Sequence, residues 1–247
     1  MLGGLLRNEA YHSVYDPQAT RNQLSFTRQI RLQDGGSASF KDISIGESRV
    51  WALDDPHQAL YFNPGSKRWS KINSKTPTGQ KLAWKSIESA SPNVVYAIEL
   101  FQGNLYFRDG INPENPKGEK WINTGLKVTQ VSSNPYVTYI ITKGSGEFKS
   151  FTTPPSSQNL KTWITSLVSH NKKITNKLSV GFGNTMVFLD ESNKLVVRER
   201  LPMKNEQYGS IWSWRPEDVV LSDVAAGPVL FGIFDNKLVA SKKGRYF

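Results

Sequence analysis

Two short apolar runs, Val50-Trp51-Ala52-Leu53 and Ala59-Leu60-Tyr61-Phe62, flank the turn-forming sequence Asp55-Pro56-His57-Gln58. Apolar and aromatic runs separated by turn residues predict a β-hairpin. A second turn at Asn63-Pro64-Gly65 leads to Trp69, which opens a third strand. A single hairpin cannot bury its own apolar face, so this one needs neighbouring strands to pack against.

The same pattern returns along the whole chain and supplies those neighbours. Two markers define each copy: an aromatic residue in the first run and an apolar residue in the second. Both markers recur with a period of about 40–45 residues, which is typical of the four-stranded blades of a β-propeller. The aromatic markers are Tyr15, Trp51, Tyr96, Tyr139, Phe188 and Phe231, and the apolar markers are Leu24, Leu60, Leu105, Phe148, Leu195 and Leu238.

Six evenly spread copies predict an all-β fold, a single β-propeller domain over residues 1–247. Six blades are the preferred arrangement and five blades are the alternative. The last copy stops where its fourth strand would begin, so we expect the propeller to be closed by its N- and C-terminal strands. A strand near Gly3 to Arg7, or the one at Tyr15, should then pair in the blade that contains Leu238 to Ser241. Such closure would remove an exposed sheet edge.

Two further features accompany the repeat. A tryptophan follows the second run in the middle copies, as Trp69, Trp121, Trp163, and Trp212 or Trp214. The segment from Asp109 to Lys120 contains two prolines and two glycines and is long for a hairpin connection. Long connections often carry function, so this segment is a candidate functional loop. No segment shows sustained helical periodicity.

Composition excludes several kinds of site. The chain has no cysteine, which excludes disulfides, thiolate metal sites and cysteine nucleophiles. Its three histidines, His12, His57 and His170, have no metal-binding spacing, so we expect no metal and no cofactor. No run reaches the ~20 apolar residues of a membrane-spanning helix. The apolar stretch at the N-terminus is too short for a secretory signal, so we expect a cytoplasmic protein, with export by another route as the alternative.

The charge is strongly positive, with a formal net value of +10. Such a charge can attract nucleic acid, anionic lipid or acidic glycans. The lysines and arginines are dispersed along the chain, and the aromatic residues occupy repeat positions that core packing explains. Because nucleic-acid binding needs aromatic platforms beside a basic groove, no specific nucleic-acid binding is expected.

Catalysis is not expected either. The chain has no Gly-x-Ser-x-Gly elbow, no P-loop and no dinucleotide-binding fingerprint. A glycosidase would need two carboxylates close together, one of them acting as an acid. The candidates Asp42, Glu88 and Asp223 lie on or near predicted inner strands, but they do not share one repeat position.

The repeat resembles the tectonin repeats of propeller lectins, which have a Val-aromatic-Ala/Gly-aliphatic run, a turn, a Leu-Tyr pair and then a tryptophan. The likeness is carried by Val50-Trp51-Ala52-Leu53 with Leu60-Tyr61, by Val95-Tyr96-Ala97-Ile98 with Leu105-Tyr106, and by Leu230-Phe231-Gly232-Ile233 with Leu238-Val239. The resemblance implies a six-bladed propeller that recognises glycans without catalysis. The unequal copies imply fewer working sites than blades.

The stretch Arg49-Val50-Trp51 also resembles the Arg-Val-aromatic strand of fungal fucose-specific propeller lectins. That family has a glutamate on the following strand, where this chain has Tyr61-Phe62-Asn63. The other copies lack the arginine as well, so repeated identical fucose sites are not expected.

These observations lead to the hypothesis of a non-catalytic lectin that binds glycans or glycoconjugates between adjacent blades. Tryptophan and tyrosine offer flat apolar faces for sugar rings, and arginine offers several fixed hydrogen-bond donors. The expected ligand-binding residues are Arg49, Tyr61 and Trp69 in the second copy, and Tyr106, Arg108 and Trp121 in the third. The alternative is a protein-interaction scaffold within a larger assembly, since unequal copies give one distinctive face.

Overall fold

A computed structural model gives the fold of the chain. The residues that it describes are 2–6, 9–14, 25–28, 32–45, 49–76, 78–91, 93–134, 136–151, 155–173, 177–180, 186–189, 193, 195–199, 211–214, 223–225, 231–234 and 237–240. The two predicted markers of the first copy, Tyr15 and Leu24, lie outside these ranges.

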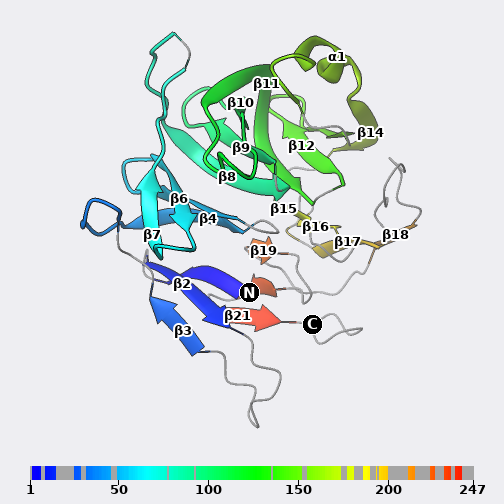
Figure 1. The fold of residues 1–247 in the computed structure, drawn as a ribbon. Coiled ribbons are helices and arrows are strands. Elements are labelled where there is room, and N and C mark those ends of the chain that lie inside the picture. The colour runs from blue at the N-terminus through cyan, green and yellow to red at the C-terminus, as the bar shows by residue number, and fades with distance from the viewer. Residues whose placement is uncertain are drawn as a thin grey trace. The chain divides into compact units, whose positions relative to one another are not determined.

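The described residues form β-strands and one short helix, in the order shown in Figure 1. The strands of the first half are β1 (Leu2–Leu6), β2 (Glu9–Val14), β3 (Ser25–Arg28), β4 (Phe40–Ile45), β5 (Val50–Asp54), β6 (Ala59–Asn63), β7 (Arg68–Lys71), β8 (Trp84–Ser91), β9 (Val94–Glu99) and β10 (Asn104–Asp109). The remaining elements are β11 (Lys120–Ser133), β12 (Thr138–Thr142), β13 (Glu147–Phe151), α1 (Leu160–Thr165), β14 (Val168–Lys173), β15 (Leu178–Val180), β16 (Met186–Leu189), β17 (Leu195–Glu199), β18 (Ile211–Trp214), β19 (Asp223–Ala225), β20 (Phe231–Phe234) and β21 (Lys237–Ala240).

Strands that follow one another in sequence are hydrogen-bonded neighbours within every sheet. The sheets have the orders β1-β2-β3, β4-β5-β6-β7, β8 to β14 consecutively, β15-β16-β17-β18, and β19-β20-β21. Antiparallel meanders of this kind are the units from which propeller blades are built. The markers of the second to the sixth predicted copies each fall on such a run of strands. The number of blades itself stays a prediction.

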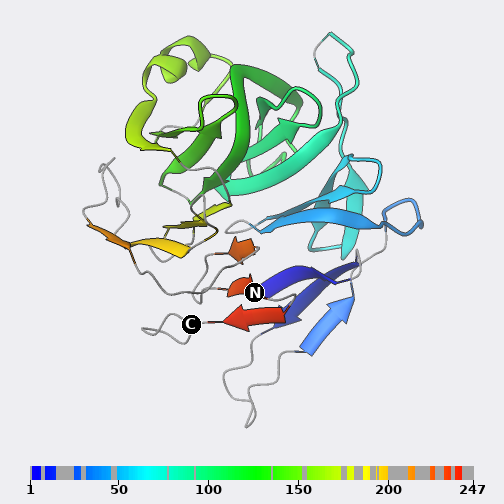
Figure 2. The ribbon, with the colours of Figure 1, turned by 180° about the vertical axis from the view of Figure 1, so that it is seen from behind.

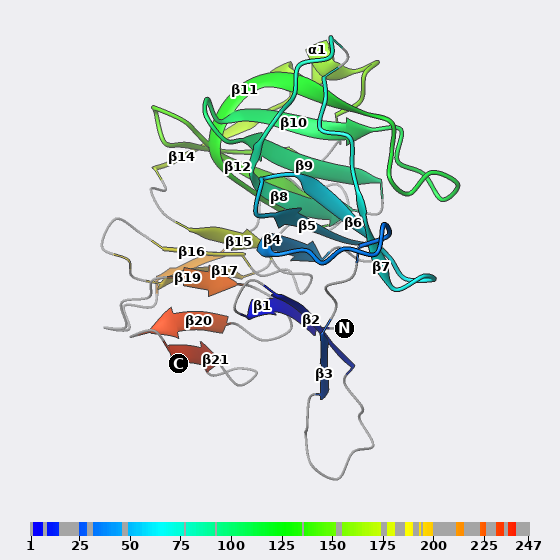
Figure 3. The ribbon, with the colours of Figure 1, turned by 90° about the vertical axis from the view of Figure 1, so that its left-hand side faces the viewer.

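The chain divides into two compact units, one made of residues 1–102 and 106–123, the other of residues 103–105 and 124–247. The long strand β11 begins in the first unit and ends in the second. In the second unit, β19 lies beside β15 and β16 (Figure 3). The organisation as one domain over residues 1–247 therefore stays a prediction.

The predicted closure by the chain ends is not found among the described strands. β1 pairs antiparallel with β2, from Leu2 opposite Ser13 to Leu6 opposite Glu9, and β21 pairs with β20 in a separate sheet. The N-terminal strand thus forms a hairpin with the residues that follow it. A local pairing of this kind has a small loop-closure cost in entropy.

Both faces of the sheet β4-β5-β6-β7 are buried, because its side chains alternate between two apolar clusters. Trp51 and Tyr61, which are paired across β5 and β6, belong to one cluster. Ala52 and Leu60, the next pair, belong to the other. This explains why almost every residue of β5 is buried, in place of the in–out pattern of a half-exposed strand.

The first strands of adjacent copies are joined by a pair of hydrogen bonds that we call the first-strand clasp. In the first unit, Asp42 Oδ2 accepts from the backbone N–H of Ile87 at 3.0 Å, and Ser44 Oγ accepts from that of Ser89 at 2.7 Å. The two acceptors are two residues apart on β4, so they lie on the same side of that strand.

The second unit repeats the first-strand clasp with different residues. Gln130 Oε1 accepts from the backbone N–H of Leu178 at 2.6 Å, and Ser132 Oγ accepts from that of Val180 at 3.0 Å. The acceptors are again two residues apart. Asp42, considered above as a possible catalytic carboxylate, thus occupies a structural position that Gln130 also fills.

We expect Asp42→Ala to lower the free energy of unfolding by about 1–3 kcal/mol, because the buried N–H of Ile87 loses its acceptor. Urea unfolding would measure the loss. Asp55→Ala is the matched control, since the described contact of the Asp55 side chain is an exposed ion pair with Lys41. Equal losses in the two variants would contradict the role of Asp42 in the clasp.

The helix α1 was not predicted from sequence, where no segment shows sustained helical periodicity. Trp163 lies in this helix, where it is buried and packs edge-on against Phe151 with ring centres 4.7 Å apart. The helix, yellow-green at the upper left of Figure 2, has six residues. Fewer than two turns are too short for the 3.6-residue period to appear in the sequence.

Candidate functional site

Most of the predicted site residues meet around one apolar cluster of the first unit. Tyr61 and Tyr106 are each 5% exposed and Trp121 is fully buried, and all three belong to this cluster. Trp69 is 2% exposed and belongs to the cluster on the opposite face of the sheet β4–β7. The structure therefore separates Trp69 from the other predicted residues.

Trp121 lies among other aromatic rings within this cluster. Its ring centre is 4.6 Å from that of Trp84 and 6.4 Å from that of Trp51. Trp51 contacts Tyr61, and Trp84 contacts Tyr106, both edge-on at ring distances of 5.6 and 5.4 Å. Such contacts contribute packing energy beyond the buried area alone. The burial of Trp121 fits packing between sheets better than an exposed platform for a sugar.

Arg108 holds the backbone of the loop from Asp109 to Lys120. Its Nε donates to Lys117 O at 2.9 Å, its Nη2 to Gly118 O at 3.2 Å, and its Nη1 to Asn73 O at 3.4 Å. The guanidinium also lies 5.3 Å above the ring of Trp121, a cation–π distance. Burial lowers the pKa of Arg108 to about 10, with Glu119 opposing the shift, so the side chain stays charged at neutral pH.

The close approach of Arg108 to the loop depends on glycine at position 118. Gly118 has a φ of 62°, and a Cβ atom there would lie 2.7 Å from both Asp109 O and Ile111 Cγ1. No side chain fits in that space. Arg49 contacts the same loop, with Nη2 donating to Asn112 O at 3.3 Å. The candidate functional loop is thus held by both predicted site arginines through its main-chain carbonyls.

Three hydrogen-bond donors around this cluster are buried and have no acceptor in the described protein: Arg49 Nη1, Trp51 Nε1 and Trp121 Nε1. By contrast, the Nε1 of Trp84, in the same cluster, donates a hydrogen bond to Ser74 Oγ at 3.0 Å. Burial lowers the pKa of Arg49 and raises that of Tyr61, and the interaction between the two opposes both shifts. Buried donors are nearly always paired, so three unpaired ones together call for an explanation.

Trp69 lines a depression with a volume of about 310 Å³ whose other lining residues are Leu32, Gln33, Asp34 and Lys71. Lys71 Nζ lies 3.2 Å from Asp34 Oδ2, and both side chains are about half exposed. The N–H of Gly36, first, and then Lys71 lower the pKa of Asp34 by hydrogen bonding to its carboxylate. The depression thus combines an indole edge, an anion, a cation and an amide.

Sequence reasoning missed Asp34, Lys71 and Gln33 as site candidates. The sequence Asp34-Gly35-Gly36-Ser37 indicates a turn between copies, which is correct for the backbone but says nothing about the neighbours of Asp34. Lys71 is two residues after Trp69 on β7, so the two share one face of the strand. That spacing was the available signal. The approach of residues 32–36 to β7, through the backbone bond from Gln33 N to Trp69 O at 2.7 Å, is a tertiary contact.

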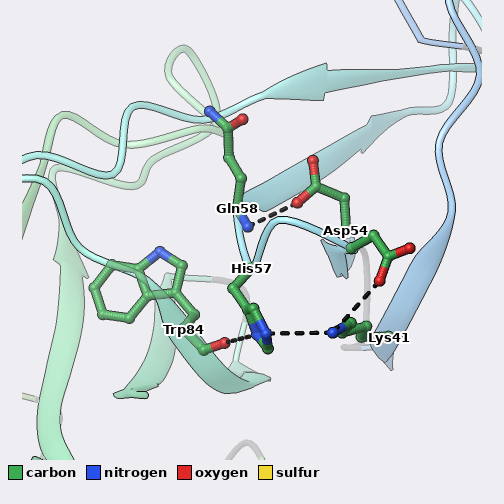
Figure 4. A network of polar contacts seen from close by, with 6 residues as sticks. Lys41, Asp54, His57, Gln58 and Trp84 are labelled. Atoms are coloured by element: carbon green, nitrogen blue, oxygen red, sulfur yellow. Dashed lines mark hydrogen bonds and ion pairs between the residues drawn. The ribbon is translucent and has the colours of Figure 1, made fainter. Parts of the chain in front are cut away.

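A polar network fixes the turn between β5 and β6 (Figure 4). His57 has a φ of 61°, its Nδ1 is 2.9 Å from Trp84 O, and its Nε2 is 3.3 Å from Lys41 Nζ. Lys41 also pairs with Asp55 at 3.4 Å. The network joins this turn to the start of β8. Within the described ranges, no group of three or more His, Asp or Glu side chains is arranged to hold a metal ion.

Comparison with known families gives one match. A family model described as a propeller, Hyd_WA, matches residues 100–122, a segment that contains β10, the loop held by Arg108, and Trp121. No curated protein matches the chain. Among the described residues, no helix has the length and apolar content that a membrane crossing requires.

Solved structures resemble the chain over most of its length. Human WBSCR16 matches with a TM-score of 0.59 and 10% identity, over 94% of this chain and 70% of that one. A nidogen/laminin complex matches at 0.60 and 9%, over 96% and 86%. The gluconolactonase XC5397 from Xanthomonas campestris matches at 0.56 and 10%, over 89% and 81%. At these identities the likeness shows the fold alone: the chain is an all-β protein with the β-propeller fold, as predicted.

Proposed function

We propose that this propeller binds glycans without catalysis, and that a saccharide occupies the depression beside Trp69. The observation that carries the proposal is the set of groups around that depression. Asp34 offers acceptors for sugar hydroxyls, Lys71 offers donors, and the indole of Trp69 offers an apolar wall. Its volume of about 310 Å³ lies at the lower end of the range for small-molecule sites.

The ion pair between Asp34 and Lys71 favours a neutral saccharide at this depression. Each charge already has a partner of opposite sign at 3.2 Å, so the pair as a whole is neutral. Neutral hydroxyl groups can accept from the lysine and donate to the carboxylate at the same time. The pair needs little desolvation to do so, since both side chains are already exposed to solvent.

Alanine at Asp34 or at Lys71 should weaken saccharide binding at least tenfold, about 1.4 kcal/mol, because each variant removes a charged hydrogen-bonding group. Calorimetric titration with the best ligand from a glycan array would measure this. Thermal stability should change little, since exposed ion pairs contribute about 0–1 kcal/mol.

The matched control is Lys41→Ala, which removes the exposed ion pair with Asp55 at 3.4 Å and leaves the depression intact. This variant should bind the saccharide normally. If the array detects no glycan, or if the Asp34 and Lys71 variants bind as the original chain does, the proposal fails.

A second function, docking of a protein partner, is favoured by Phe101. This side chain is 77% exposed at the turn between β9 and β10. The buried carboxylate of Glu99 fixes the turn by accepting from the N–H groups of Phe101 at 2.8 Å and Gln102 at 2.7 Å. A rigidly presented aromatic side chain is a common anchor in protein interfaces. Retained partner capture by a Phe101→Ser variant would exclude this residue as the anchor.

A further inference from the structure

We propose that Arg49, Trp51 and Trp121 form a second binding site, which takes an anionic oxygen group such as the carboxylate of an acidic sugar. The site is separate from the depression beside Trp69, since these residues lie on the opposite face of the sheet β4–β7. It does not depend on saccharide binding at that depression.

The first observation is that these side chains share one environment. Arg49 directly precedes β5 and lies two residues before Trp51, so the extended chain projects both side chains from the same face. Tyr61, directly opposite Trp51, interacts electrostatically with Arg49 and packs against Trp51. Trp121 contacts Trp51 edge-on at 6.4 Å. Donors from β5 and β11 therefore gather around one apolar cluster.

The second observation is that the donors outnumber the acceptors. Arg49 Nη1, Trp51 Nε1 and Trp121 Nε1 are buried and have no acceptor among the described protein atoms. None of the described carboxylates forms an ion pair with Arg49. Indole N–H and guanidinium groups can only donate hydrogen bonds. A ligand that fits them must bring acceptors, and an anion brings the strongest ones.

The third observation concerns charge. Arg108 places a second guanidinium over the ring of Trp121, and its own hydrogen bonds go to neutral backbone carbonyls. Two cationic side chains thus border a cluster whose members are apolar or neutral, and the Glu119 carboxylate acts on Arg108 but forms no ion pair with Arg49 among the described residues. In such surroundings an anion is attracted more strongly than in water, because screening is weaker. A neutral sugar would gain nothing from the charge.

The approach to the site lies where Arg49 reaches the surface. Arg49 is partly exposed, and among the described residues its Nη2 makes one long bond, 3.3 Å, to Asn112 O on the exposed part of the loop. An acid group can pair with the guanidinium at this point. The indole N–H groups of Trp51 and Trp121 then supply uncharged donors that distinguish the site from a lone surface arginine.

Titration of tryptophan fluorescence with sodium glucuronate, sodium acetate and glucose, at constant ionic strength, tests the proposal. We expect glucuronate and acetate to bind. Any fluorescence change caused by glucose should be the same in the original chain and in the Arg49→Met variant. Tighter binding of glucuronate than acetate would identify an acidic sugar as the ligand, and equal binding would identify the carboxylate alone. Arg49→Met should reduce the affinity for both anions at least tenfold.

Phenylalanine substitutions separate binding from folding. Trp51→Phe and Trp121→Phe remove the unpaired N–H groups and keep an aromatic ring, so anion affinity should fall with little change in melting temperature. Trp84→Phe is the matched control, because its N–H is already bonded to Ser74. That variant should retain anion binding. The proposal is overturned if the original chain does not bind the anions, or if Arg49→Met and Trp121→Phe bind them with unchanged affinity. Neither outcome bears on saccharide binding at the depression beside Trp69.

Discussion

Replacement of Trp121 by alanine should lower the free energy of unfolding by about 3–5 kcal/mol, the usual cost of removing a core tryptophan. Trp121 is fully buried and contacts two other tryptophan rings and the guanidinium of Arg108. For a chain of this length, each kcal/mol corresponds to roughly 2–4 °C in melting temperature. Calorimetry or circular dichroism would detect the change directly.

Two variants calibrate this result. Trp69→Ala should also be strongly destabilising, since Trp69 is 2% exposed and its ring centre lies 5.0 Å from that of Phe40. Phe101→Ala should change the melting temperature little, because that ring is 77% exposed. A stability of Trp121→Ala close to that of Phe101→Ala would show that the indole is accessible, and would restore Trp121 as a stacking platform.

Removal of the Arg108 guanidinium is the second large expected effect. Arg108→Met should lower the free energy of unfolding by about 2–4 kcal/mol, because hydrogen bonds to charged groups contribute ~1.5–3 kcal/mol and Arg108 makes three part-buried ones. The loop from Asp109 to Lys120 should also open locally. Cleavage at Lys117 and Lys120 by a lysine-specific protease would report that opening. Such a protease does not cut after arginine, so Arg108→Met leaves the number of cleavage sites unchanged.

The Arg108→Lys variant shows whether the hydrogen bonds of the guanidinium or its positive charge stabilises the loop. A lysine ammonium keeps the charge but cannot reach Lys117, Gly118 and Asn73 in the planar geometry of a guanidinium. Arg108→Lys should therefore be cleaved at Lys117 and Lys120 nearly as fast as Arg108→Met, with fragments cut at position 108 identified by mass spectrometry and counted separately. Protection equal to that of the original chain would mean that charge near Trp121, and not the hydrogen bonds, holds the loop.

The strands were predictable because each one is bounded by turn residues. The run from Val50 to Leu53 became β5 and the run from Ala59 to Phe62 became β6, with one residue added to each. The tryptophan after the second run was also predictable as a packing residue. In the second copy Trp69 packs on Phe40. In the third copy Trp121 packs on Trp84, so the same contact recurs.

The candidate site was less predictable because both faces of the sheet are buried. Tyr61 and Tyr106 hold similar positions in consecutive copies, yet both enter the same cluster, one from β6 and one from β10. The two-residue period of a strand shows that successive side chains lie on opposite faces of the sheet. It does not show which other element packs against each face. Arginines beside aromatic residues read equally well as sugar donors or as loop anchors, and only the positions of the Lys117 and Gly118 carbonyls decide for Arg108.

The first-strand clasp has a consequence for how the chain reaches its native state. The bond from Ile87 to Asp42 spans 45 residues, and the bond from Leu178 to Gln130 spans 48. Each clasp therefore closes a loop of nearly the same length, and the entropy of loop closure rises only slowly with length. Once one copy has formed, it presents acceptors that capture the next strand to be ordered. Folding can thus proceed by successive additions of similar cost, each copy building on the one before it, as in arrays of repeats.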